Sequence, residues 1–131
     1  KLMLQLKEGK KELYIVDDKD GTPTYTHDFA KNVHLLIEKE YWGLYNMVCG
    51  GQTSRIEVAK ELLKILNKEK EIKITPVSSE YFIDKYSAPR PVSERLINKK
   101  LDLRDLNIMR DWRIALAEYI DRYYSGYLDN K

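Results

Sequence analysis

Tyr81 and Lys85 have the spacing at which one helical turn can bring a tyrosine beside a lysine. In such a pair the tyrosine can act as a general acid while the lysine lowers its pKa. Pro76 and Pro89 bracket this stretch, and because proline interrupts helices they leave room for only a short one. We therefore predict that the pair is a chance match, and we assign no catalytic residue to the sequence.

Two histidines and one cysteine are the remaining candidates for metal or nucleophilic chemistry. His27 and His34 are seven positions apart, which on a helix places them roughly 10 Å apart, too far to share a metal ion. Cys49 has no histidine nearby in the sequence, and apolar residues precede it. We expect no metal site, and we expect Cys49 to be buried and structural.

Glycines could mark a phosphate-binding loop, but their pattern here does not. Gly50 and Gly51 lack both the Gly-x-Gly-x-x-Gly spacing and a following Gly-Lys-Ser/Thr. We interpret them as a turn and predict no cofactor-binding residue. In contrast, Ala88-Pro89-Arg90-Pro91 is a rigid loop with an arginine, since two prolines restrict its backbone.

Composition restricts the class of protein. The 131 residues are 43% hydrophobic and 34% charged, which is typical of one globular unit spanning residues 1–131. The net charge of +2 comes from 23 basic and 21 acidic residues, a balance that argues against nucleic acid as the partner. Apolar runs are too short to cross a membrane. With a single cysteine, we expect a cytoplasmic protein.

Helix and strand signals alternate along the chain, which predicts an α/β fold. Thr26 and Ser54 are the expected helix caps, and Pro76 is expected to end a strand. The predicted helices cover residues 1–10, 26–43, 54–67, 78–85 and 112–123, and the predicted strands cover residues 13–16, 44–49 and 72–75.

Three of these helices carry apolar stripes that we expect to be packed in the core. The predicted buried faces are Phe29, Ala30, Val33, Leu36 and Ile37; Ile56, Ala59, Leu62, Leu63 and Leu66; and Trp112, Leu116, Tyr119, Ile120 and Tyr123.

Four segments, in order, resemble those of the dTDP-4-dehydrorhamnose reductases, members of the extended short-chain dehydrogenase superfamily. The most specific is residues 16–30, with Asp18, Gly21, Pro23-Thr24-Tyr25 and Asp28-Phe29-Ala30 in the family's order. The other three are Gly43-Leu44-Tyr45-Asn46 with a following glycine and Ser54; Ala88-Pro89-Arg90-Pro91 with Ser93 and Leu96; and Lys100-Leu101 with Trp112 and Leu116.

The resemblance implies that this chain is the C-terminal, substrate-binding part of a Rossmann-type enzyme, with the N-terminal dinucleotide-binding domain outside it. The parent would transfer a hydride from NADPH or NADH to dTDP-4-dehydro-L-rhamnose and yield dTDP-L-rhamnose. The fragment alone would bind neither cofactor and would be inactive. Its expected partners are a dTDP-linked sugar, its own N-terminal domain and, in a homodimer, a second copy.

The resemblance also implies substrate-binding residues. Arg90 would clamp the diphosphate, a role for which a guanidinium is suited because it binds through two parallel hydrogen bonds. Thr24 and Tyr25 would line the substrate cleft. One position departs from the family, since Lys19 replaces a glutamine and puts any contact of that amide in doubt.

Three other functions remain open from the sequence. The first is a non-catalytic regulator, because the β subunit of methionine adenosyltransferase is similar to these reductases and works by binding an enzyme partner. Another sugar-nucleotide epimerase or reductase of the same superfamily would use the same scaffold. A small stand-alone binding module, even for nucleic acid, is the last alternative.

Overall fold

The computed structural model, which describes residues 1–85 and 90–128, combines a small parallel sheet with several helices, so the predicted α/β class is confirmed. The elements are α1 (Leu2–Lys7), β1 (Glu12–Val16), α2 (Thr26–Glu38), α3 (Arg55–Ile65), β2 (Lys73–Val77), the 3-10 helix η1 (Ser79–Lys85), α4 (Lys99–Asp102) and α5 (Trp112–Tyr124).

The sheet consists of β1 and β2, which pair in parallel with Leu13 opposite Ile74 and Ile15 opposite Pro76. The prediction that Pro76 ends the second strand is wrong, because β2 continues to Val77. In a parallel pair, alternate residues turn their backbone groups toward the neighbouring strand. Lys73 and Val77 bond to the β1 side, so the nitrogen of Pro76 faces the open edge, where a missing N–H costs no ladder bond.

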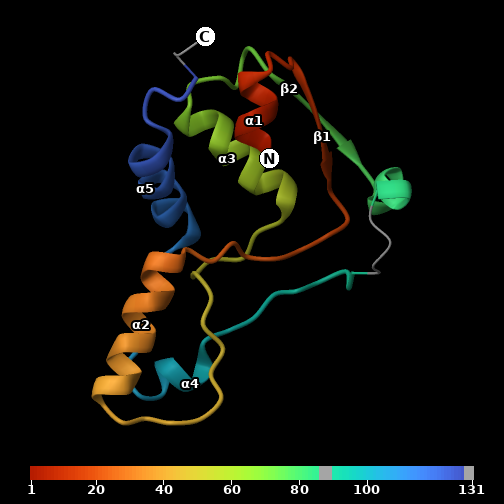
Figure 1. The fold of residues 1–131 in the computed structure, drawn as a ribbon. Coiled ribbons are helices and arrows are strands. Elements are labelled where there is room, and N and C mark those ends of the chain that lie inside the picture. Colours follow the sequence, from red (N-terminus) through yellow and green to blue (C-terminus); the bar gives the residue numbers. More distant parts are fainter. Residues whose placement is uncertain (86–89, 129–131) are drawn as a thin grey trace.

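Helix α3 covers the sheet, and α1 and α5 lie beside it (Figure 1). As predicted, Ser54 caps α3, accepting a hydrogen bond from the Glu57 amide at 3.4 Å. The predicted apolar face of α3 is confirmed as well, because all five of its residues belong to the main core. The fully buried members of this core are Met3, Leu6, Leu13, Ile15, Ala59, Leu62, Leu63, Ile72 and Ile120.

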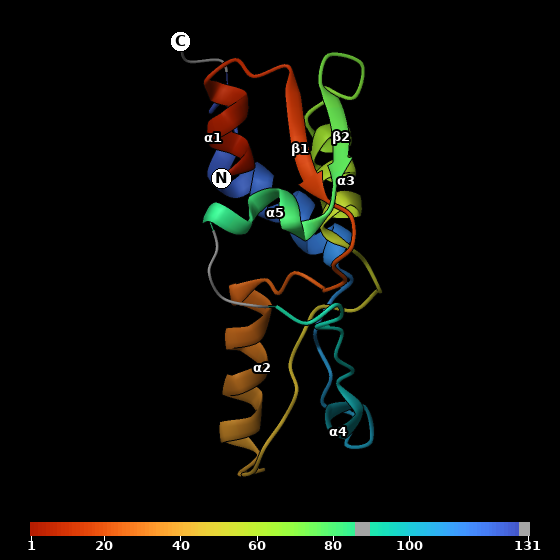
Figure 2. The ribbon, with the colours of Figure 1, turned by 90° about the vertical axis from the view of Figure 1, so that its right-hand side faces the viewer.

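Helices α2 and α4 lie away from the sheet, as both ribbon views show (Figures 1 and 2). Leu36 of α2 packs there against Leu101 and Leu106 in a small separate cluster. Where α2 begins, a third cluster joins Tyr25 and Cys49 to the start of α5. None of the helices in the described residues is long and apolar enough to cross a membrane.

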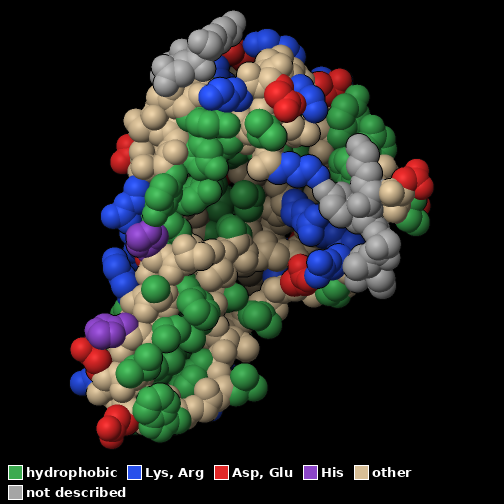
Figure 3. Space-filling view, in the orientation of Figure 1, with side chains coloured by type: hydrophobic (Ala, Val, Ile, Leu, Met, Phe, Trp, Pro, Cys, Tyr) green, Lys and Arg blue, Asp and Glu red, His purple; other side chains and the backbone are tan. Residues whose placement is uncertain are grey.

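The predicted buried face of α2 is confirmed for Leu36 and wrong for Phe29, Ala30 and Ile37. Phe29 and Ile37 are 41% and 52% exposed, and apolar side chains gather over this helix in the space-filling view (Figure 3). Asp28 and Asn32 are buried instead. The Asn32 amide donates to the Leu106 carbonyl at 3.0 Å and accepts from the Ile108 amide at 3.1 Å, and a polar side chain with its hydrogen bonds satisfied can be buried.

Residues 44–49, predicted to be a strand, are extended but pair with no strand in the described part of the chain. Leu44 is 87% exposed. The backbone of Val48 bonds at both its N–H (2.9 Å) and its C=O (2.8 Å) to the amide of Asn98. An apolar run becomes a strand only where a neighbouring backbone completes the ladder, and a single side chain cannot do so.

The turn after this segment places Gly51 against α5, where it adopts a left-handed backbone with φ +86°. A Cβ at this position would lie 2.6 Å from an Asp111 carboxylate oxygen and 2.9 Å from Trp112 Cδ1. Gly51→Ala should therefore combine backbone strain with steric overlap and reduce the free energy of unfolding by about 2 kcal/mol or more. Urea unfolding would measure the loss.

Gly9 is the matched control for this prediction, since its φ is +80° and a Cβ there would meet nothing within 4 Å. Gly9→Ala should show only the backbone contribution, roughly 1 kcal/mol. Equal losses at the two positions would contradict the close approach of Gly51 to Asp111 and Trp112.

Candidate functional site

Three loops that are distant in the sequence meet at one place, which we call the loop junction: residues 19–25, 50–54 and 90–95. Asp20 is at its centre, because its amide donates to the Val92 carbonyl and its carbonyl accepts from the Glu94 amide, both at 2.9 Å. The Asp20 carboxylate forms an ion pair with Arg95 at 2.9 Å. The junction is therefore held by backbone and side-chain contacts together.

The turn that contains Gly51 is attached to the same junction. The Gly21 amide donates to the Thr53 carbonyl at 3.1 Å, and the Thr22 hydroxyl donates to the Gly51 carbonyl at 3.0 Å. Thr22 lines two cavities at this junction, while Asp20, Gly21 and Pro23 line the larger of them only.

The larger cavity, of about 500 Å³, lies between β1, the start of α3 and the loop junction. Its apolar side includes Tyr14, Val58 and Phe82, and its polar side includes Arg55 and Glu94. Figure 3 shows a hollow near the centre of the molecule, with lysine and arginine side chains along one wall. A volume of this size, with an apolar wall and a few polar groups, is typical of a small-molecule site.

The smaller cavity, of about 300 Å³, lies on the other side of Thr22. Gly50, Gly51, Arg95 and Asn98 are among the residues that line it. Its polar groups are engaged with one another: Arg95 pairs with Asp20, and the Asn98 amide holds the Val48 backbone. We therefore regard the larger cavity as the candidate binding site.

Of the three predicted substrate-binding residues, Arg90 lies at the loop junction and is exposed. Its carbonyl accepts a hydrogen bond from the Lys19 ammonium at 3.0 Å, which joins it to the segment that contains Thr24. Thr24 is exposed as well, immediately after Pro23 of the cavity wall. Ala88 and Pro89, from the same predicted loop, lie outside the described residues.

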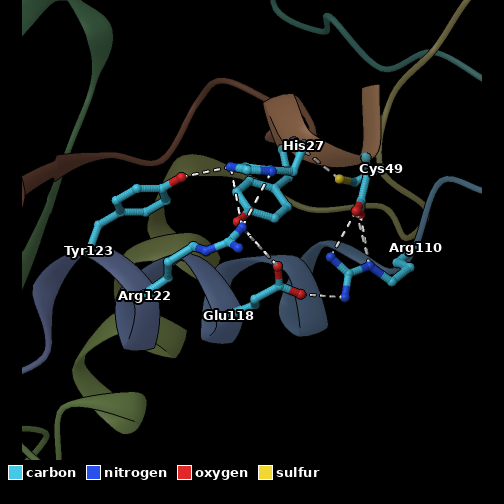
Figure 4. A network of polar contacts seen from close by, with 8 residues as sticks. His27, Cys49, Arg110, Glu118, Arg122 and Tyr123 are labelled. Carbon is cyan, nitrogen blue, oxygen red and sulfur yellow. Dashed lines mark hydrogen bonds and ion pairs between the residues drawn. The ribbon is translucent and has the colours of Figure 1, made fainter. Parts of the chain in front are cut away.

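Tyr25, the third predicted residue, is only 7% exposed and points toward α5 rather than into solvent. Its hydroxyl donates to Glu118 Oε1 at 3.2 Å, and its backbone amide donates to the Cys49 sulfur at 3.4 Å. Burial raises the pKa of the Tyr25 hydroxyl, so it remains a hydrogen-bond donor at neutral pH. Tyr25 thus connects the loop junction to Glu118 of α5. Figure 4 shows the polar network around Glu118, with Arg110 and Arg122 beside it.

Arg110 is the central cation of this network. Its guanidinium binds both oxygens of Asp28, at 2.7 to 3.1 Å, and a second carboxylate, Glu118, at 2.6 Å. The hydrogen bonds that Arg110 donates to Asp28, followed by the one that it donates to Glu118, raise the pKa of Arg110 above its usual value. The same guanidinium lowers the pKa of Glu118. Since Asp28 is 2% exposed, Arg110 provides the charge that compensates a buried carboxylate.

His27 and Tyr123 extend the network along α5. The His27 Nε2 lies 2.6 Å from the Tyr123 hydroxyl, and Arg122 lies 3.3 Å from His27 Nδ1. Tyr119 and Tyr123 are 38% and 51% exposed, so the prediction that the whole apolar stripe of α5 is packed is wrong for these two. Their hydroxyl groups contact polar partners at the surface: Tyr123 contacts His27, and Tyr119 contacts the Tyr124 hydroxyl. Burial of these two rings in the core would remove those contacts.

Cys49 is buried, as predicted, and is 3% exposed. Burial raises the pKa of its thiol, and the hydrogen bond from Tyr25 opposes this shift only in part. The thiol is therefore protonated at neutral pH and acts as a packing group.

Tyr81 lies on η1, which is kinked at Phe82. In a 3-10 helix, residues three apart are aligned, so a spacing of four no longer puts two side chains on one line. The Tyr81 ring instead stacks on Tyr14, with centroids 5.4 Å apart and planes 9° apart. The side chain of Lys85 lies outside the described residues, and the interpretation of this pair as a chance match stays a prediction.

The sequence did not reveal the network as a unit. Asp28 was noted only as part of the Asp28-Phe29-Ala30 segment of the family resemblance, and Arg110 carried no motif. They are 82 positions apart, so no local spacing could have paired them. Within residues 1–85 and 90–128, no group of three or more His, Cys, Asp or Glu side chains could hold a metal ion.

Comparison with known proteins agrees with this architecture. A family model, the RmlD substrate binding domain, matches residues 1–125. The chain is 34% identical over 124 residues to the spore coat polysaccharide biosynthesis protein SpsK of Bacillus subtilis, covering 95% of this chain and 42% of that protein. It is 30% identical over 117 residues to a dTDP-4-dehydrorhamnose reductase of Mycobacterium tuberculosis, covering 88% of this chain and 38% of that protein.

Solved structures agree with these sequence matches. A dTDP-4-dehydrorhamnose reductase from Clostridium acetobutylicum superposes with a TM-score of 0.85 and 33% identity, over 95% of this chain and 43% of that one. The Bacillus anthracis dTDP-4-dehydrorhamnose reductase in complex with NADP superposes with a TM-score of 0.80 and 27% identity. The match covers 93% of this chain and 41% of that one. The chain thus spans less than half the length of the relatives it matches.

Proposed function

The chain belongs to the RmlD substrate binding domain family, and from that membership we propose that it is the substrate-binding part of a dTDP-4-dehydrorhamnose reductase. The parent would reduce the C4 ketone of dTDP-4-dehydro-L-rhamnose to the alcohol of dTDP-L-rhamnose, with a nicotinamide as hydride donor. The observation that carries the proposal is the loop junction, where the family's Asp-x-x-Gly-x-Pro-Thr and Arg-Pro segments meet beside one cavity.

The loop junction suits a nucleotide sugar by its chemistry. Arg90 is exposed next to Pro91, and a restricted backbone reduces the ordering entropy that is lost when its guanidinium binds a diphosphate. The larger cavity offers aromatic surface from Tyr14 and Phe82 for a base or sugar ring. Thr24 and Tyr25 complete the proposed substrate-binding set, Thr24 by direct contact and Tyr25 through its position between the junction and α5.

Cofactor binding belongs, in this proposal, to an N-terminal dinucleotide domain that contacts this chain. The Bacillus anthracis relative is in complex with NADP, which supports NADPH as the hydride donor. The cofactor would supply the hydride, while the residues of this chain hold and orient the nucleotide sugar. The parent would be a cytoplasmic enzyme of the short-chain dehydrogenase superfamily.

An assay of the full-length protein tests this function directly. We expect oxidation of NADPH that depends on dTDP-4-dehydro-L-rhamnose, with dTDP-L-rhamnose as the product. A full-length protein that binds the nucleotide sugar without turning it over would instead indicate a regulator, similar to the methionine adenosyltransferase β subunit. Turnover of a different dTDP-sugar would indicate another reductase or epimerase of the superfamily.

The same assay can test whether Tyr81 is a catalytic residue. Tyr81→Phe in the full-length protein should leave turnover within a few-fold of the unmodified enzyme, because the Tyr81 ring is stacked on Tyr14 and Phe retains that contact. A thousandfold loss of kcat would contradict this prediction and place the active site within this chain.

A further inference from the structure

Lys19 connects the two segments on which the proposed function depends. Its ammonium donates to the carbonyl of Arg90 at 3.0 Å, across 71 positions of sequence. The contact places the Lys19 ammonium against the backbone of the residue that we propose as the diphosphate ligand. Because the sequence pattern of the family has a glutamine at this position, the lysine adds a positive charge that the resemblance does not explain.

The carboxylates around Lys19 are engaged elsewhere. Asp20 pairs with Arg95 at 2.9 Å, and Asp18 accepts two hydrogen bonds from Ser79, at 2.8 and 3.0 Å. In the part of the chain that the structure describes, no ion pair joins Lys19 or Arg90 to a carboxylate. An anion bound beside the Lys19 ammonium would give it a charged partner.

From this juxtaposition we propose that Lys19 is a second ligand of the diphosphate and makes this protein more selective for the charge of its substrate. The inference rests on the proposed function, since it concerns the same nucleotide-sugar site. An ammonium has three N–H donors, and the Arg90 carbonyl takes one of them. The other two can reach a phosphate oxygen while the first keeps the Arg90 backbone in place.

The test separates charge from position by using three substitutions of Lys19 in the full-length protein. Gln can still donate a hydrogen bond to the Arg90 carbonyl but has no charge, whereas Arg keeps the charge and Met has neither property. Calorimetry with dTDP as the probe should show a dissociation constant about tenfold higher for Lys19→Gln and Lys19→Met. Lys19→Arg should remain within about threefold of the unmodified protein.

Salt provides a second measure of the charge. The affinity of the unmodified protein for dTDP should fall more steeply with ionic strength than that of Lys19→Gln, because one ionic contact is missing in the variant. Lys31→Gln, on the exposed side of α2, is the control and should leave both dTDP affinity and its salt dependence unchanged. Thermal unfolding of each variant should agree within about a degree if Lys19 acts on the ligand.

The outcomes distinguish this inference from the proposed function. If Lys19→Gln binds dTDP as tightly as the unmodified protein while Arg90→Ala does not, Lys19 is not a ligand and the proposed function stands. If Lys19→Arg loses as much affinity for dTDP as Lys19→Gln, the loss comes from the changed geometry of the side chain and not from its charge. The inference is then overturned. If the unmodified protein fails to bind dTDP, the proposed function itself is wrong.

Discussion

Replacing Arg110 with alanine is expected to reduce the free energy of unfolding by about 3 kcal/mol. The substitution leaves Asp28, which is 2% exposed, without the guanidinium that binds both of its oxygens. It also removes the contact with Glu118 that connects the start of α2 to α5. Urea unfolding of the full-length protein, followed through tryptophan fluorescence, would measure the loss.

Two further variants show whether the buried charge is the cause. Combining Arg110→Ala with Asp28→Asn removes the uncompensated carboxylate, so the double variant should be more stable than Arg110→Ala alone. Arg113→Ala, in the first turn of α5, is the control, since Arg113 is 51% exposed and its ion pair with Asp111 is 3.7 Å long. Its loss should stay below about 1 kcal/mol. A double variant no more stable than the single one would contradict this explanation.

Replacing Arg90 with alanine should raise the KM for the nucleotide sugar roughly ten- to hundredfold, because a charge-assisted hydrogen bond contributes about 1.5 to 3 kcal/mol. Arg90→Lys should also be costly, since an ammonium keeps the charge but loses the planar fork that binds two phosphate oxygens. Steady-state kinetics with the full-length enzyme measure both, and the KM for NADPH should change far less.

Arg104, which follows α4 and lies over the Tyr41 ring at 4.6 Å, is the matched control for loss of an exposed arginine. Arg104→Ala should leave the KM for the nucleotide sugar unchanged. If Arg90→Ala instead lowers the melting temperature without affecting this KM, the arginine is structural and the proposed diphosphate clamp is wrong.

Local sequence signals identified most of the elements because each signal acts within a few residues. The Ser54 cap and the apolar periodicity of α3 need no distant partner to be recognised. The same is true of the apolar setting of Cys49. These predictions were confirmed because backbone capping and hydrophobic periodicity operate within one or two helical turns.

Predictions that depended on distant partners were wrong. Residues 44–49 have the composition of a strand, but the structure offers them an asparagine side chain in place of a neighbouring strand. The buried face of α2 is polar at Asp28 and Asn32, because Arg110 and the backbone near Leu106 satisfy these groups. Periodicity cannot anticipate such partners, since it registers only the hydrophobicity of the residues themselves.

The sequence by itself determined the α/β class, the family resemblance and Arg90 as the candidate substrate ligand, because these depend on residue types at short, ordered spacings. Only the tertiary structure placed the Lys19 ammonium on the Arg90 carbonyl and Arg110 on Asp28. These contacts join positions 71 and 82 residues apart. The covalent chain keeps residues close in space only when they are a few positions apart in the sequence. Residues this distant in the sequence become neighbours only when the chain folds.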